Sequence, residues 1–165
     1  MSINPLNPTA QHEFIGALEL GGTKTVVAIG HQTGQVIEEW RFPTTMPEET
    51  LLRAVNWLNT QGMPKRIGVG SFGPIRLDPA SESGVCLLNT PKLAWQNFPI
   101  GSFLRTAAPN STFFWETDVN AAALAEVTLG AAQGCSNAIY LTIGTGIGAG
   151  AVSYTHLTLP TKRIV

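Results

Sequence analysis

The chain has 165 residues, of which 44% are hydrophobic and 13% are charged, a composition that can build a packed core and excludes a disordered protein. Its length predicts one ordinary domain. The net charge of −1 and the absence of basic runs exclude the electrostatic footprint of a nucleic-acid-binding protein, and no apolar stretch approaches the ~20 residues of a membrane-spanning helix.

The first part of the chain predicts three antiparallel strands followed by a helix and a further strand. Residues 1–12 are polar, contain two prolines and are expected to form a flexible N-terminus. Apolar and β-branched runs separated by glycine turns predict the strands, and leucine and valine at helical spacing after Pro47 predict the helix. The strands are expected at 13–20, 25–30, 35–42 and 65–73, and the helix at 48–61.

The second part alternates helices with strands and closes on a hairpin. Residues 74–97 hold three prolines and predict a long irregular loop, a feature that is usually functional in a compact domain. Helices are expected at 98–107 and 118–130, and strands at 111–117, 137–144 and 147–152. Together these elements predict a mixed α/β sheet whose glycine turns face one cleft.

Two of the glycine turns have nearly the same chemistry. Gly21-Gly22-Thr23-Lys24 and Gly144-Thr145-Gly146 each join two apolar strands. Glycines leave backbone N–H groups open, and a threonine hydroxyl adds a donor, so such turns suit phosphate oxygens. The alternative is an ordinary tight hairpin, which would be preferred for one such turn alone. Neither turn fits a P-loop or a dinucleotide-binding fingerprint.

Asp118 lies where an apolar strand meets a predicted helix. An aspartate in this position is most often a helix cap, and the residue by itself favours that interpretation. The alternative is a general base that takes a proton from a substrate hydroxyl. Asn120, two residues later, offers an amide that with Asp118 could bind neighbouring hydroxyls of a sugar. Gly73 and the segment Thr90-Pro91-Lys92 are candidate loop contacts.

Five segments then resemble successive motifs of the ROK sugar kinases, in particular their bacterial fructokinase branch. They occur in the family's order and spacing between Ile15 and Val152. The most specific are TDVNAAALAE and GTGIGAG, and the others are ELGGTKTVVAIG, GVGSFGPI and NTPKLAW. The resemblance implies an actin-like ATPase fold of the ribonuclease H type, in which two domains close on a cleft for Mg-ATP and a hexose.

The resemblance also implies roles for individual residues. Asp118 would be the catalytic general base, and Glu19 would help to position the metal-bound phosphates. The residues expected to bind the ATP phosphates are Gly21, Gly22, Thr23, Lys24, Gly144, Thr145, Gly146 and Gly148. The residues expected to bind the sugar are Gly73, Thr90, Pro91, Lys92 and Asn120. Glu19 and Thr117 stand where glucokinase-like members carry other residues, which favours fructose.

The end of the chain predicts a fragment. Residues 13–151 are expected to be the N-terminal kinase domain, without the second half that carries the family's zinc cluster, so zinc is expected only in a full-length protein. Residues 152–161 match the translation of a transposase sequencing adapter, and we therefore expect 152–165 to be an assembly artefact. The rival interpretation is a natural strand with a short basic end.

The sequence is compatible with three functions. The first is an ATP-dependent hexose kinase, here truncated and inactive, which would act on fructose or on another hexose or N-acetylhexosamine. The second is a sugar-responsive repressor, disfavoured because only 12 residues precede the first expected strand. The third is a non-catalytic sugar- or nucleotide-binding module. Cys86 and Cys135 form no metal or disulfide pattern, so a cytoplasmic protein is expected, homodimeric at full length.

Overall fold

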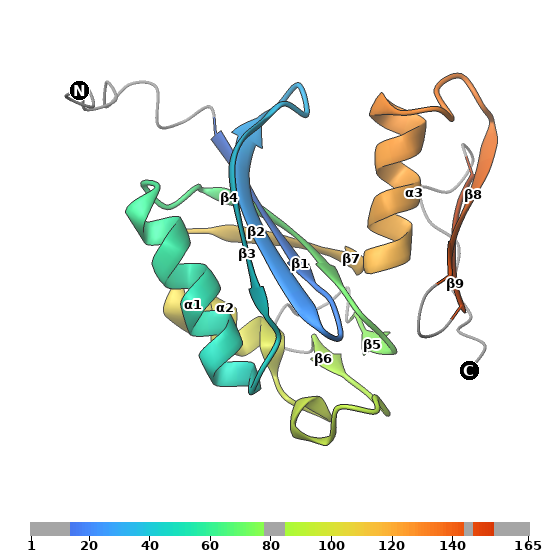
Figure 1. Ribbon diagram of the computed structural model, residues 1–165. Helices are drawn as coiled ribbons and strands as arrows, with labels where there is room; N and C mark the ends of the chain where they lie inside the picture. Colours follow the sequence, from blue (N-terminus) through green and yellow to red (C-terminus); the bar gives the residue numbers. More distant parts are fainter. Residues whose placement is uncertain (1–13, 78–84, 144–146, 154–165) are drawn as a thin grey trace.

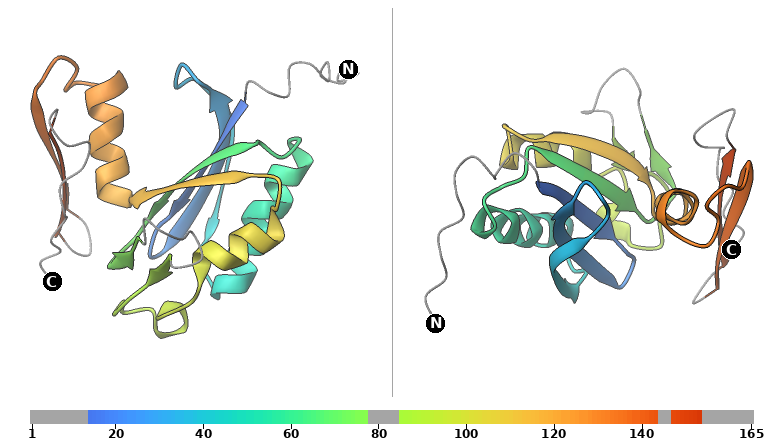
Figure 2. Two further views of the ribbon diagram at one scale, coloured as in Figure 1. Left: turned by 180° about the vertical axis from the view of Figure 1, so that it is seen from behind. Right: turned by 90° about the horizontal axis from the view of Figure 1, so that it is seen from above.

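A five-stranded sheet is the centre of the molecule (Figure 1). The computed structural model describes residues 14–77, 85–143 and 147–153. Helices α1 and α2 cover one face of the sheet, whereas α3 and the hairpin β8–β9 lie on the other side (Figures 1 and 2). The mixed α/β architecture predicted from the sequence is confirmed.

The elements follow the expected order closely. The strands are β1 (Phe14–Leu20), β2 (Lys24–His31), β3 (Val36–Pro43), β4 (Arg66–Ser71), β5 (Ile75–Arg76), β6 (Cys86–Leu87), β7 (Thr112–Thr117), β8 (Asn137–Ile143) and β9 (Ile147–Ser153). The helices are α1 (Pro47–Thr60), α2 (Ile100–Ala107) and α3 (Asp118–Leu129), with a 3-10 turn at Leu93–Trp95. The predicted irregular loop at 74–97 therefore contains a small β5–β6 pair, and the flexible segment expected at 1–12 lies outside the described residues.

The order of the main sheet is β3-β2-β1-β4-β7. Strands β1, β2 and β3 form the predicted antiparallel meander, whereas β1, β4 and β7 run parallel. Leu20 is in register with Ser71, and Ser71 with Thr117. Because parallel strands end at the same edge of a sheet, the loops that follow Leu20, Ser71 and Thr117 emerge side by side.

The hydrophobic core lies between the sheet and the helices α1 and α2. Leu18, Val27 and Val69 point to this face in one row, and Leu51 and Leu58 of α1 close it from the other side. Each of these side chains is almost fully buried. The row that alternates with them, which includes Glu19 and Gly70, points to the face on which α3 packs.

Glycines let α3 approach the sheet closely and let the hairpin approach α3 closely. A Cβ atom on Gly70 would lie 3.3 Å from the Cβ of Ala121 on α3. A Cβ on Gly150 in β9 would overlap the carbonyl oxygen of Val119, in the first turn of α3. Val152 and Ser153 complete β9 opposite Ala138 and Asn137, and Val152 is buried. The rest of the expected artefactual tail lies outside the described residues.

We predict that Gly150→Ala lowers the free energy of unfolding by about 1–3 kcal/mol, because the added methyl group overpacks against backbone that cannot rotate away. Gly68→Ala is the matched control, since a Cβ there meets no atom within 4 Å. Urea denaturation followed by circular dichroism measures both variants. Equal stability of the two variants would contradict the packing that the structure gives to β9.

Candidate active site

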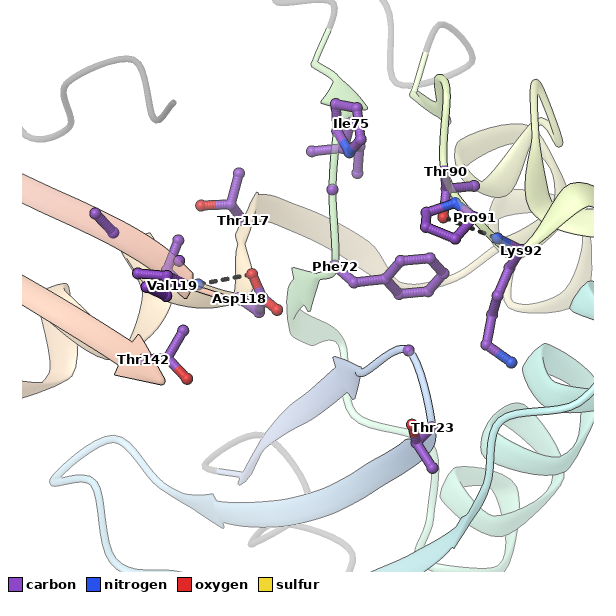
Figure 3. Close-up of a pocket in the computed structure, with 16 residues that line it drawn as sticks. Thr23, Phe72, Ile75, Thr90, Pro91, Lys92, Thr117, Asp118, Val119 and Thr142 are labelled. Atoms are coloured by element: carbon purple, nitrogen blue, oxygen red, sulfur yellow. Dashed lines mark hydrogen bonds between the residues drawn. The ribbon is translucent and has the colours of Figure 1, made fainter. Parts of the chain in front are cut away.

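A pocket of about 380 Å³ lies at the edge of the sheet where β1, β4 and β7 end (Figure 3). Five segments that are distant in the sequence line it. They are the β1–β2 turn with Gly22 and Thr23, the segment 72–75 after β4, the loop 90–92, the start of α3 at 117–119, and the hairpin with Thr142 and 147–149. The parallel register of the three strands is what brings the first, second and fourth of these segments together.

The β1–β2 turn is closed by a hydrogen bond from the Gly21 N–H to the Lys24 carbonyl, at 3.1 Å. A Cβ on Gly21 would lie only 2.5 Å from that carbonyl oxygen, so this position requires glycine. Gly22 faces open space instead, because a Cβ there would meet no atom within 4 Å. The turn therefore presents bare backbone at Gly22 to the pocket, as an anion-binding turn must.

Asp118 lies on the wall of the pocket opposite Lys92 (Figure 3). It is the first residue of α3, and its Oδ1 accepts a hydrogen bond of 2.9 Å from the N–H of Val119. The helix cap is Thr117, whose hydroxyl accepts from the N–H of Asn120 at 3.2 Å. The start of a helix stabilises a carboxylate, so Asp118 is held as an acceptor beside the pocket.

The loop at 90–92 forms the other wall. Thr90 is buried, whereas Pro91 is exposed. The Lys92 ammonium extends toward the β1–β2 turn and donates to the carbonyl of Thr44 at 3.2 Å. Gly73, Thr90, Pro91 and Lys92 all line the pocket together with Asp118, although the chain separates them by up to 45 residues (118 − 73).

Glu19 and Lys24 are exposed and do not line the pocket. Glu19 lies in one row with Gly70 and Glu116, on the face of the sheet that α3 covers. Arg41 belongs to the same row through its pairing with Val26. The hydrogen bond to Glu39 and, to a smaller extent, the charge of Glu19 raise the pKa of the Arg41 guanidinium.

Asn120, which is expected to bind the sugar, does not line this pocket in the structure. The residue is 3% exposed. Its Nδ2 donates to Glu116 Oε1 at 2.9 Å, and its Oδ1 accepts from the N–H of Ala151 at 3.3 Å. Asn120 thus fastens the β8–β9 hairpin to the end of β7. Of the second glycine turn, Gly148 lines the pocket, and Gly144, Thr145 and Gly146 lie outside the described residues.

Several residues of the pocket were not predicted from the sequence. Phe72 directly follows β4, so the rule that loops after parallel strands meet at one edge would have found it. No sequence pattern marks Val119 and Thr142 as lining the pocket, because their position there depends on how the hairpin packs on α3. Among the described residues, no group of three His, Cys, Asp or Glu side chains could hold a metal ion, and no helix is long and apolar enough to cross a membrane.

A model of the ROK family matches residues 15–159. The chain belongs to the ROK family. It is 41% identical over 144 residues to a fructokinase of Pediococcus pentosaceus, covering 87% of this chain and 49% of that protein. It is 39% identical over 139 residues to a fructokinase of Lactococcus lactis, covering 84% of this chain and 46% of that protein. The chain therefore spans about half the length of the curated relatives it matches.

Solved structures agree with this assignment. The ROK hexokinase from Thermus thermophilus superposes with a TM-score of 0.70 and 34% identity, over 91% of this chain and 50% of that one. The fold is the actin-like ATPase fold of the ROK kinases, and this chain corresponds to an N-terminal half of it. The ROK resemblance drawn from the motifs is thus confirmed.

We predict that Asn120→Ala lowers the free energy of unfolding by about 1–3 kcal/mol, because it leaves the Ala151 N–H and the Glu116 carboxylate without this buried partner. Hydrogen exchange at the amide of Ala151 should accelerate. Thr60→Ala, which removes an exposed hydrogen bond at the end of α1, is the control.

Asn120→Asp should show a pH dependence that Asn120→Ala lacks. The substitution places a second carboxylate in contact with that of Glu116, and two like charges so close together repel. The folded state is therefore expected to lose stability as the pH rises and both carboxylates become charged. Denaturation at about pH 4 and about pH 7 should show a larger deficit at the higher pH. Equal deficits would contradict the contact with Glu116.

Proposed function

We propose that this chain is the N-terminal half of an ATP-dependent hexose kinase whose substrate is fructose. The observation that carries the proposal is the pocket itself, where a carboxylate, a glycine turn and the 90–92 loop share one volume. Sugar kinases need these three parts in one place: an acceptor for the hydroxyl proton, a cradle for phosphates and a polar wall for the sugar. The two fructokinases named above point the same way.

The proposed roles follow the positions of the residues. Gly22 and Thr23 bind the nucleotide's phosphates together with Gly148 from the hairpin, since all three line the pocket. Gly21 keeps the turn closed behind them. The sugar lies against Gly73 and the 90–92 loop. We extend the phosphate site to Gly144, Thr145 and Gly146 by their motif alone.

Asp118 acts as the general base. As the sugar oxygen forms its bond to the γ-phosphorus and the bond to the β-phosphate oxygen breaks, the hydroxyl proton passes to the Asp118 carboxylate. Phosphoryl transfer depends mainly on positioning and on neutralising charge. The bond from the Val119 N–H to Asp118 Oδ1 fixes the direction of the carboxylate before the sugar binds.

Magnesium is proposed to arrive with ATP. Bound Mg²⁺ would neutralise charge on the phosphates, and oxygen ligands such as carboxylates are those it prefers. Glu19, exposed near the end of β1, is the residue proposed to help orient the metal-bound phosphates. Lys24, at the end of the β1–β2 turn, is proposed to bind the phosphates with its positive charge. No zinc site is proposed for the described residues; we propose zinc only for the second half.

The choice of fructose rests on the relatives. Identity to fructokinases is 36–41% for the Pediococcus and Streptococcus mutans proteins, against 28% for the glucokinase of Thermotoga maritima. A ROK glucokinase from Streptomyces griseus was solved with glucose and AMPPNP, which supports one cleft for sugar and nucleotide in this fold. We further propose a homodimer and a cytoplasmic location for the full-length protein, where ATP and free sugars meet.

We predict that Asp118→Asn in the full-length protein lowers kcat by about 10²–10⁴-fold, because the amide cannot take the proton. Full-length protein means the domain at residues 13–151 continued by a second half of the kind that the relatives carry. The Kd for fructose should change little. A coupled ADP-release assay over fructose, glucose, mannose and N-acetylglucosamine measures both the loss and the specificity. A preference for another sugar would overturn the proposal that fructose is the substrate. An Asp118→Asn variant with the turnover of the wild type would overturn the proposal that Asp118 is the general base.

The 165-residue chain by itself is predicted to have no sugar-dependent ATP turnover. Half a cleft cannot enclose both substrates, and the outer face of β8 leaves Ile139 72%, Leu141 62% and Ile143 79% exposed. Apolar strand faces of this kind are normally covered, here by the proposed second half. The same coupled assay, run on the purified chain and on the full-length protein, checks this. Clear turnover by the short chain would contradict it.

A further inference from the structure

Thr44, the residue directly after β3, holds the β1–β2 turn from behind. Its side chain is only 6% exposed. Its hydroxyl donates to the Gly21 carbonyl at 2.7 Å, and its backbone N–H donates to the Thr23 carbonyl at 2.9 Å. Two of the carbonyl groups in the turn are therefore bound by one residue that lies outside the pocket.

A second threonine fixes the direction of the Thr44 hydroxyl. Thr25 Oγ1 lies 2.8 Å from Thr44 Oγ1, and Thr25 is fully buried. Thr44 has one hydroxyl proton, which goes to Gly21, so Thr25 must donate the proton between the two threonines. The chain of donors runs from Thr25 to Thr44 to the Gly21 carbonyl, and it has one orientation only.

The hydrogen bond to the Gly21 carbonyl also fixes the direction of the Gly22 N–H. The carbonyl of Gly21 and the N–H of Gly22 belong to one planar trans peptide and point in opposite directions. When the Gly21 carbonyl is held on Thr44, the Gly22 N–H is held facing away from Thr44, and Gly22 lines the pocket. Phosphate oxygens require N–H groups in front and carbonyl oxygens turned away.

We propose that Thr44 is the positioning residue that presents the Gly22 N–H to the nucleotide's phosphates. The proposal rests on the kinase function proposed above and adds to it a residue that does not touch the substrate. No motif in the sequence marks Thr44, because its partners are 19 to 23 residues away along the chain.

Thr44 also joins the β1–β2 turn to the 90–92 loop. Its carbonyl accepts from the Lys92 ammonium at 3.2 Å, and the next carbonyl, that of Thr45, accepts from the Trp95 indole N–H at 2.8 Å. Trp95 is 1% exposed and packs in the core, so this second bond anchors the segment to a rigid part of the fold. The turn and the 90–92 loop are thereby tied to the same short segment.

The experiment is a pair of substitutions in the full-length protein. Thr44→Val removes the hydroxyl at nearly constant shape, and Thr44→Ser keeps it. Isothermal titration with ATP, and separately with fructose, gives the two Kd values. Thr44→Val is expected to raise the Kd for ATP about fivefold to tenfold, with the Kd for fructose unchanged and Thr44→Ser within about twofold of wild type. A merely structural defect would lower the active fraction without separating the two ligands.

An unchanged Kd for ATP in a folded Thr44→Val variant would overturn the proposal. An equal rise in the Kd for ATP and the Kd for fructose would also overturn it. Thr44→Ala is the second variant, for the case that Thr44→Val does not fold. It removes the same donor to the Gly21 carbonyl and should raise the Kd for ATP by the same amount, about fivefold to tenfold; no rise overturns the proposal. A wild-type protein that binds ATP but transfers no phosphate would refute the kinase function while the binding data still test Thr44.

Discussion

The parallel register of β1, β4 and β7 determines where the loops that form the pocket leave the sheet. Leu20, Ser71 and Thr117 end their strands in one row, so the chain leaves the sheet at a single edge three times. A shift of any strand by one residue would turn its buried face outward, and the core between the sheet and α1 forbids this. The packing that stabilises the domain therefore also fixes where the site is.

The two faces of the sheet have different roles: one packs the core that stabilises the domain, and the other positions the site. One face carries the large apolar side chains that pack on α1 and α2. The other carries Gly70, which lets α3 approach until Ala121 nearly touches the sheet. This close approach brings the first turn of α3, with Asp118, to the edge where the β1–β2 turn lies. Small residues here serve the site by allowing contact between backbones.

Polar contacts behind the pocket are as important as the residues that line it. Thr44 and Thr25 orient the β1–β2 turn, and Glu116 and Asn120 hold the hairpin against the end of β7. These hydrogen bonds join elements that are far apart in the sequence or that are separated by a sharp turn. A pocket built from five segments keeps its shape only when such links remove the freedom of the loops between them.

The main helices and strands, the family and about half of the residues that line the pocket could be predicted from the sequence. Local alternation and helix spacing depend on neighbouring residues, so the meander, α1 and α3 were predictable, and the glycine turns and Asp118 stood out as motifs. The sequence did not predict that Asn120 is buried against Glu116, that Glu19 lies outside the pocket, or that Thr44 holds the turn. These facts depend on strand register and on close packing of α3, which bring together residues that no local pattern connects.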